Sequence, residues 1–190
     1  DAVKLASKEN PLGPSPRATA RLASALDELH VYPDGAARRL TAALGARFQL
    51  ADDHFIVGNG SDAVIKLIAE AYFEPGDDIV CAQPTFSQYA FGAALMGAQV
   101  QYVPLMDDMR HDLEAMAARI GPRTKAVFIC NPNNPTGTTV TKEQFVQFLK
   151  RVPKHVLIVV DEAYAEYTDE DGLFVVAAVR EGDPRVIVLR

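Results

Sequence analysis

Residues 126–137 read Ala126-Val127-Phe128-Ile129-Cys130-Asn131-Pro132-Asn133-Asn134-Pro135-Thr136-Gly137, an apolar run followed at once by a polar turn. The apolar run is typical of a buried strand. Two Asn-Pro steps and a closing glycine predict a rigid turn, because proline fixes its own φ and keeps the preceding residue out of the helical region. An asparagine amide held in this way can hydrogen-bond a phenolate oxygen of a ligand. A purely structural turn is the alternative, although such a turn rarely needs so many specified residues.

The same succession of apolar run, loop and helical segment extends through the chain. Strands are predicted at Phe55–Val57, Ile79–Ala82, Gln99–Val103, Ala126–Cys130, Val156–Val160 and Val186–Leu189. Helices are predicted at Asp62–Phe73, Ser87–Met96, Asp112–Ile120, Lys142–Val152 and Leu173–Arg180. Apolar strands alternating with helices predict an α/β fold with a mainly parallel central sheet flanked by helices. Ligands of such sheets bind at the carboxyl ends of the strands, so a site is expected in the loops after them.

The first 30 residues are predicted to form an arm and a first helix, distinct from residues 31–190. Three prolines and a glycine in residues 8–16 exclude regular helix there. A helix is predicted at Arg17–Leu29, where alanine and leucine recur at helical spacing. The turn Tyr32-Pro33-Asp34-Gly35 then leads to a second helix that ends near Phe48.

Composition and charge exclude several function classes. Hydrophobic residues make up 48% of the 190 residues and the net charge is −6, so nucleic acid is not an expected partner. No apolar run approaches the roughly 18 residues that span a bilayer. The two cysteines, Cys81 and Cys130, end apolar runs, as buried free thiols do, which favours a cytoplasmic protein. The four histidines lack metal-ligand spacing, so no metal site is expected.

Two loops that follow predicted strands could bind the anionic and flat parts of a ligand. In Gly58-Asn59-Gly60-Ser61-Asp62, small residues at a helix N-terminus allow backbone N–H groups to approach an anion, and Ser61 offers a hydroxyl. An ordinary N-cap with a tight turn is an equal alternative. In Pro84-Thr85-Phe86-Ser87-Gln88-Tyr89, an aromatic ring could stack on a flat ligand or simply cap the core of the sheet.

A third loop, Asp161-Glu162-Ala163-Tyr164, places a carboxylate at the end of a buried strand. Burying such a charge is costly unless it is paired, and a protonated ring nitrogen of a ligand would be a suitable partner. Tyr164 lies three residues on and could turn its hydroxyl to the same site. The alternative is an aspartate that caps the following segment.

Taken in order, these loops resemble the fold-type I, class I/II aminotransferases, the family of aspartate aminotransferase. The resemblance rests on Asn59–Asp62, Pro84–Phe86, Asn134–Gly137 and Asp161–Tyr164. Three further features resemble the histidinol-phosphate aminotransferase branch: the doubled asparagine, the Tyr32-Pro33-Asp34 turn and the Glu9-Asn10-Pro11 arm. The likeness runs from Leu5 to Arg190.

The resemblance implies a pyridoxal-phosphate (PLP) cofactor and a role for each matching residue. Gly60, Ser61 and Asp62 would hold the phosphate, and Phe86 would stack on the ring. Asn134 and Tyr164 would contact the ring oxygen, and Asp161 the ring nitrogen; Asp161 and Tyr164 are the expected catalytic residues. Tyr32 would reach the phosphate of the neighbouring subunit in a homodimer, and Asn10 would close over the substrate.

The family also carries a lysine that forms a Schiff base with PLP, in a loop after a strand. None of the seven lysines of this chain follows a strand. The lysine is therefore expected beyond Arg190, so that residues 31–190 would be an incomplete large PLP-binding domain, truncated before the C-terminal small domain. As given, the chain is expected to be inactive.

The activity implied for the intact protein is a step of histidine biosynthesis. It would interconvert L-histidinol phosphate and 2-oxoglutarate with imidazole-acetol phosphate and L-glutamate. An aromatic-amino-acid aminotransferase or an amino-acid-phosphate decarboxylase of the same fold would share these motifs. From another class, a non-catalytic PLP-sensing module is the alternative, whereas a dinucleotide-binding oxidoreductase would need a third glycine after Gly58-Asn59-Gly60.

Overall fold

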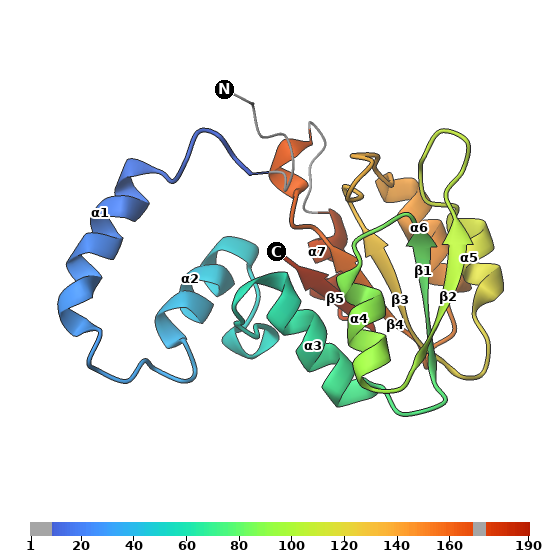
Figure 1. The fold of residues 1–190 in the computed structure, drawn as a ribbon, viewed down its shortest axis with the longest axis horizontal. Helices are drawn as coiled ribbons and strands as arrows, with labels where there is room; N and C mark the ends of the chain where they lie inside the picture. The colour runs from blue at the N-terminus through green and yellow to red at the C-terminus, as the bar shows by residue number, and fades with distance from the viewer. Residues whose placement is uncertain (1–8, 169–173) are drawn as a thin grey trace, which may run out of the picture. The chain divides into compact units, whose positions relative to one another are not determined.

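The computed structural model describes residues 9–168 and 174–190 (Figure 1), and the chain divides into two units, Asp1–Arg38 and Arg39–Arg190. In the first unit, α1 (Pro16–Ala25) begins after Ser15, whose hydroxyl accepts the Ala18 N–H at 3.2 Å, and continues into the short 3₁₀ turn η2 (Leu26–Glu28). The predicted helix is confirmed, with a tighter last turn. The proposed boundary at residue 30 stays a prediction.

The second unit is built on a parallel sheet in the order β2-β1-β3-β4-β5. Its strands are β1 (Asp78–Gln83), β2 (Gln99–Pro104), β3 (Thr124–Cys130), β4 (Leu157–Asp161) and β5 (Val186–Leu189). Every pairing in it is parallel. Five of the six predicted strands are therefore confirmed, each within two residues of its predicted ends.

Two layers of helices cover the sheet (Figure 1). On one face lie α3 (Gly60–Tyr72) and α4 (Gln88–Leu95); on the other lie α5 (Leu113–Arg119), α6 (Lys142–Arg151) and α7 (Phe174–Arg180). The strands are buried on both sides because successive side chains point to opposite faces. Thus Ala126, Phe128 and Cys130 pack against α3 and α4, whereas Val127 and Ile129 pack against α5 and α6.

Local signals in the sequence explain where several helices begin. Thr141 and Gln144 form a capping box at the start of α6, in which each side chain bonds the other residue's backbone N–H. Asp112 caps α5 through the Ala115 N–H at 2.9 Å. The second predicted helix is α2 (Arg38–Phe48), followed by the 3₁₀ turn η3 (Asp52–His54); a further turn, η4 (Ala165–Tyr167), lies between β4 and α7.

The strand predicted at Phe55–Val57 is wrong. Phe55 has an extended backbone (φ −118°, ψ 132°), but the segment joins no strand of the described residues, and Ile56 is 76% exposed. An apolar triplet can be extended without pairing, and only a neighbouring backbone makes it a strand. Among the described residues, no helix has the length and apolar character needed to cross a membrane.

Candidate functional site

The candidate site lies at the carboxyl edge of the sheet, where the loops after β1, β3 and β4 begin. Parallel pairing brings their last residues together, and Cys130 is in register with Asp161. Directly past them, the Asn131 N–H donates to the Asp161 carbonyl at 2.8 Å. The predicted clustering of the loops that carry Phe86, Asn134 and Asp161 follows from this topology.

Asp161 is the most deeply buried carboxylate assigned to the site from the sequence, with 3% of its surface exposed. Its Oδ2 accepts the Tyr89 hydroxyl at 2.8 Å, and its Oδ1 accepts the Ala163 N–H at 3.1 Å. Burial raises the pKa of Asp161, and the nearby charge of Asp62 raises it further. The hydrogen bonds from Tyr89 and Ala163 act in the opposite direction and lower it. Within residues 9–168 and 174–190, no lysine, arginine or histidine pairs with Asp161. The carboxylate is oriented, but its charge has no counter-ion.

Tyr89 holds Asp161 from the first turn of α4. The tyrosine is fully buried, and its ring stacks on Phe128 with centroids 4.7 Å apart. Phe86 meets the Tyr89 ring edge-on at 5.7 Å and is itself half-buried. Burial raises the pKa of Tyr89 well above its usual range, so its hydroxyl keeps its proton and acts as the donor.

The N-terminus of α3 is open. The helix begins at Gly60, whose φ of +74° is a conformation that glycine adopts without strain, and Asn59 at the N-cap makes no side-chain capping bond. Neither Ser61 nor Asp62 serves as the cap. A side-chain cap, part of the alternative for this loop, is thus absent, although the Gly60 N–H donates to the Gly58 carbonyl at 3.0 Å in a tight turn. Among the described residues, no hydrogen bond uses the N–H groups of Ser61 and Asp62, which follow in this 13-residue helix.

In the loop after β3, the three asparagines differ in what their side chains do. The Asn131 Oδ1 accepts the Val140 N–H at 2.8 Å, and the buried Asn133 amide bonds Thr85, Pro84 and Thr136. Among the described residues, no hydrogen bond uses the amide of half-buried Asn134. Asn134, the residue predicted to contact a ligand, is the one left free to do so.

The structure places the other predicted residues with less definition. The Tyr164 ring lies against Tyr167 with centroids 6.2 Å apart, and no hydrogen bond within the described ranges uses its hydroxyl. Asn10 and Tyr32 belong to the first unit, where the Asn10 side chain accepts the Leu12 N–H at 2.9 Å and Tyr32 is 97% exposed. Their roles stay predictions.

The whole chain matches the model of a known protein family. The profile of "Aminotransferase class I and II" matches residues 1–190. The chain belongs to this aminotransferase family. It is 51% identical over its whole length to a histidinol-phosphate aminotransferase of Moorella thermoacetica and 43% identical to an aromatic amino acid aminotransferase of Thermobifida fusca. It spans about half the length of these curated relatives, 49% of the first and 52% of the second.

Solved aminotransferase structures share the fold. The histidinol-phosphate aminotransferase of Sinorhizobium meliloti, solved in complex with pyridoxal-5'-phosphate, superposes with a TM-score of 0.88 at 28% identity. The alignment covers 96% of this chain and 49% of that one. The predicted fold class, a large-domain α/β sheet of this family, is confirmed.

Three buried polar residues of this aminotransferase chain were not predicted as part of the site: Tyr89, Asn133 and Glu162. Tyr89 and Asn133 lie inside the motifs, and their roles depend on partners 72 and 48 residues away, which one sequence does not reveal. Glu162 is 1% exposed, its Oε2 lies 3.2 Å from Arg190 Nε, and burial raises its pKa to about 7. The Asp-Glu pair in the sequence could have signalled two competing buried charges.

A separate hollow of about 240 Å³ lies between α5 and α6, lined in part by His111, Phe148 and Arg151. None of the predicted site residues lines it. His111 is buried, its Nε2 donates to the Cys130 carbonyl at 3.0 Å, and burial lowers its pKa. Because it is neutral and tied to the sheet, His111 has a structural role. Among the described residues, no cluster of three or more His, Cys, Asp or Glu side chains could hold a metal ion.

Proposed function

We propose that the intact protein is a PLP-dependent aminotransferase. The observation that carries the proposal is Asp161, a buried, oriented carboxylate whose charge no cation of the described residues balances. A buried charge without a partner is costly, and a protonated pyridinium nitrogen supplies the missing positive charge. The aminotransferase in complex with PLP that shares this fold supports the same choice.

Other features of the site fit the remaining parts of PLP. The start of α3 has no side-chain cap; there Gly60 allows close approach of the phosphate, and Ser61 and Asp62 offer backbone N–H groups and the Ser61 hydroxyl. Phe86, half-buried at the rim, offers a ring face for stacking, and the unused amide of Asn134 suits the ring oxygen. We assign Tyr164 to the same oxygen because it follows Asp161 in the loop.

When bound, PLP acts as an electron sink for bonds at the substrate Cα. The residues of this chain support that chemistry by fixing charge. Asp161 would hold the proton on the ring nitrogen, since an ionised carboxylate beside that atom favours its charged form. Tyr89 would keep Asp161 ionised and aligned through its 2.8 Å bond. We expect the intact protein to carry the catalytic lysine of the family, and we assign this role to none of the lysines described here.

For the substrate, we propose L-histidinol phosphate with 2-oxoglutarate as the amino acceptor, a step of histidine biosynthesis. Relatives named histidinol-phosphate aminotransferase support this at 51%, 46% and 48% identity. An aromatic amino acid is the second candidate, favoured by the 43% identical Thermobifida fusca protein. Both substrates carry a flat ring beside the amine, so the residues in hand suit either.

We further propose a cytoplasmic homodimer in which Tyr32 and Asn10 complete the site. Two buried free cysteines suit a reducing compartment. Exposed apolar side chains on α3 and α4, including Leu67, Tyr72 and Phe91, offer a surface for a second subunit. Residues 31–190 would then form part of the large PLP-binding domain.

The test is borohydride reduction of the whole protein with PLP, followed by peptide mapping and by assay with L-histidinol phosphate and aromatic amino acids. A reduced adduct on one lysine, with turnover of histidinol phosphate, is expected. An adduct with turnover of aromatic amino acids alone would select the second substrate. PLP binding without any adduct or turnover would contradict the proposed enzyme activity and indicate a cofactor-sensing module instead.

A further inference from the structure

The amide of Asn133 ties together two loops that belong to different strands. Its Oδ1 accepts the Thr85 hydroxyl at 2.7 Å, and its Nδ2 donates to the Pro84 carbonyl at 3.2 Å and to Thr136 Oγ1 at 2.9 Å. The carbonyl of Pro84 can only accept, which fixes the orientation of the amide. Asn133 itself is 2% exposed.

The backbone of Asn133 is engaged as well. Its N–H donates to the Thr138 carbonyl at 2.9 Å, and its carbonyl accepts the Gly137 N–H at 2.7 Å. Thr136 and Thr138 share a hydroxyl bond of 2.8 Å, and Thr138 reaches the Met109 carbonyl at 2.7 Å. The network thus links the loops after β1 and β3 and extends to the loop after β2.

The residues that Asn133 ties down flank two that are proposed to contact PLP. Thr85 directly precedes Phe86, and Asn133 directly precedes Asn134. We propose that Asn133 is a positioning residue that clamps the loop after β1 to the loop after β3, and so fixes the spacing of Phe86 and Asn134. The inference rests on the proposed binding of PLP to those two residues.

The physical benefit of the clamp is preorganisation. A loop that is already ordered does not lose conformational freedom when a ligand binds, so the ligand binds more tightly. Separating the loops would break the two hydrogen bonds between them and leave the buried Asn133 amide unpaired. Because an unpaired buried amide is costly, these two bonds are enough to order the loops. The two adjacent asparagines therefore have different roles: Asn133 holds the two loops together, and Asn134 faces the ligand.

The experiment compares five variants of the whole protein: N133A, T85V, T85S, the double variant N133A/T85V, and T124V. Thr124 is the matched control, since its buried hydroxyl donates to Asp78 at 2.6 Å between the same two strands, β1 and β3, at their amino ends. The measurements are the PLP dissociation constant of the apoprotein, its thermal midpoint, and hydrogen exchange of residues 84–89 and 131–137 without PLP.

We expect N133A to weaken PLP binding about tenfold and T85V about threefold, with faster exchange in both loops. T85S keeps the hydroxyl and is expected to restore wild-type binding. T85V should add less than about twofold in the N133A background, because both changes remove the same bond. T124V should lower the thermal midpoint and leave PLP binding and the exchange of both loops unchanged.

The clamp is refuted if N133A and T85V behave like T124V, losing stability while PLP binding and loop exchange stay at wild-type levels. An undiminished effect of T85V in the N133A background would also refute it. A parent protein that binds no PLP would overturn the proposed function instead. The exchange of the two loops, measured without PLP, separates that failure from a failure of the clamp.

Discussion

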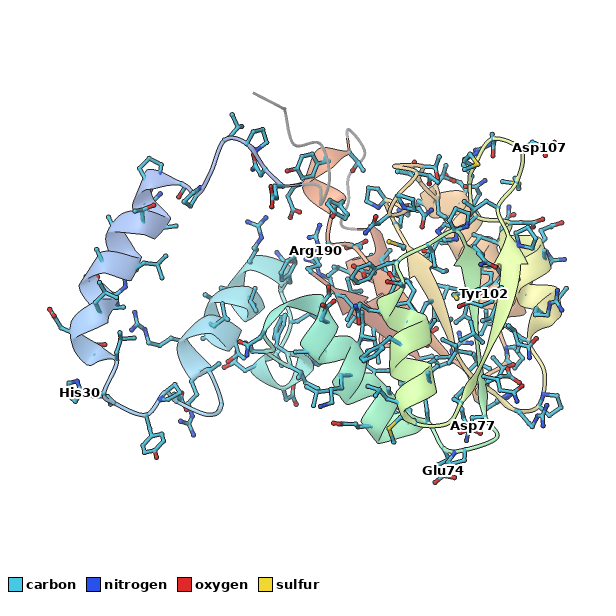
Figure 2. The ribbon with its side chains drawn as sticks, in the orientation of Figure 1. His30, Glu74, Asp77, Tyr102, Asp107 and Arg190 are labelled. Carbon is cyan, nitrogen blue, oxygen red and sulfur yellow. The ribbon has the colours of Figure 1, made fainter. Side chains whose placement is uncertain are left out.

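Each edge of the sheet buries a carboxylate that accepts a hydroxyl hydrogen bond, but the two carboxylates have different surroundings. At the amino edge, the Thr124 hydroxyl donates to Asp78 at 2.6 Å and accepts the Gly121 N–H at 2.9 Å. At the carboxyl edge, burial raises the pKa values of Asp161 and Glu162, and Asp161 has no cation within the described chain. In Figure 2, Asp77 marks the amino edge and Asp107, past β2, lies toward the opposite edge. The Asp78 carboxylate lies between two strands at the amino edge, whereas the Asp161 carboxylate lies where the loops of the candidate site meet.

The largest expected effect comes from removing the charge at the carboxyl edge. D161N keeps the shape of the side chain but leaves the ring nitrogen of PLP without its carboxylate. We expect kcat of the whole protein to fall about 10²- to 10³-fold, since breaking a buried ion pair costs roughly 3–5 kcal/mol. The matched control, D78N at the amino edge, should lose stability and keep kcat. Equal loss of kcat in both variants would contradict the contrast between the edges.

The second prediction concerns Glu162 and the pH dependence of stability. Its pKa rises from 4.5 to about 7 because burial disfavours the charge, against the attraction of Arg190. Between those pH values Glu162 binds more protons in the folded state than in the unfolded state. Its contribution to stability is therefore fully present below pH 4.5 and is lost as pH rises through 7. The change is on the order of 1–3 kcal/mol.

E162Q removes this titration. The drop in thermal midpoint between pH 5 and pH 8 should therefore be smaller in the variant than in the parent protein. E166Q is the control, because Glu166 is 69% exposed and lies 3.8 Å from Arg190. An unchanged pH dependence in E162Q would show that Glu162 is ionised throughout, and the carboxyl edge would then hold only Asp161 as an unbalanced charge.

Y89F tests how the site keeps Asp161 ionised. The hydroxyl of Tyr89 lowers the pKa of Asp161, so its loss should raise that pKa and move the acid limb of the kcat/KM profile to higher pH. A loss of about tenfold in kcat/KM is expected near neutral pH. Y102F removes the hydroxyl of an exposed tyrosine on β2 and should change neither quantity (Figure 2). If kcat/KM fell equally at every pH and the acid limb did not shift, the role of Tyr89 would be packing alone.

The sequence predicts the strands and the turn after β3 better than the details of the carboxyl edge. Strand β3 and its turn follow from local chemistry, because an apolar run and two prolines constrain the backbone directly. Phe55–Val57 shows the limit, since an extended triplet becomes a strand only with a partner. Tyr89 and Asn133 show it again: their bonds to Asp161 and Thr85 join positions far apart along the chain. The order of the motifs predicted which loops form the candidate site, and tertiary packing determines which of their polar side chains are already hydrogen-bonded.

The smallest effect is expected for a hydrogen-bonded pair whose two residues lie close together in the sequence. The capping box of Thr141 and Gln144 begins α6 one residue after Val140, whose N–H is held by Asn131. T141A should lower the free energy of unfolding by about 1 kcal/mol, because one helix N–H loses its acceptor. PLP binding should stay at the parent level, as measured by the same titration used for N133A. T141S, which keeps the hydroxyl, is the control. A parallel loss of PLP affinity would mean that the loop after β3 is ordered from α6 as well as from Asn133, and the clamp would then share its role with a helix cap.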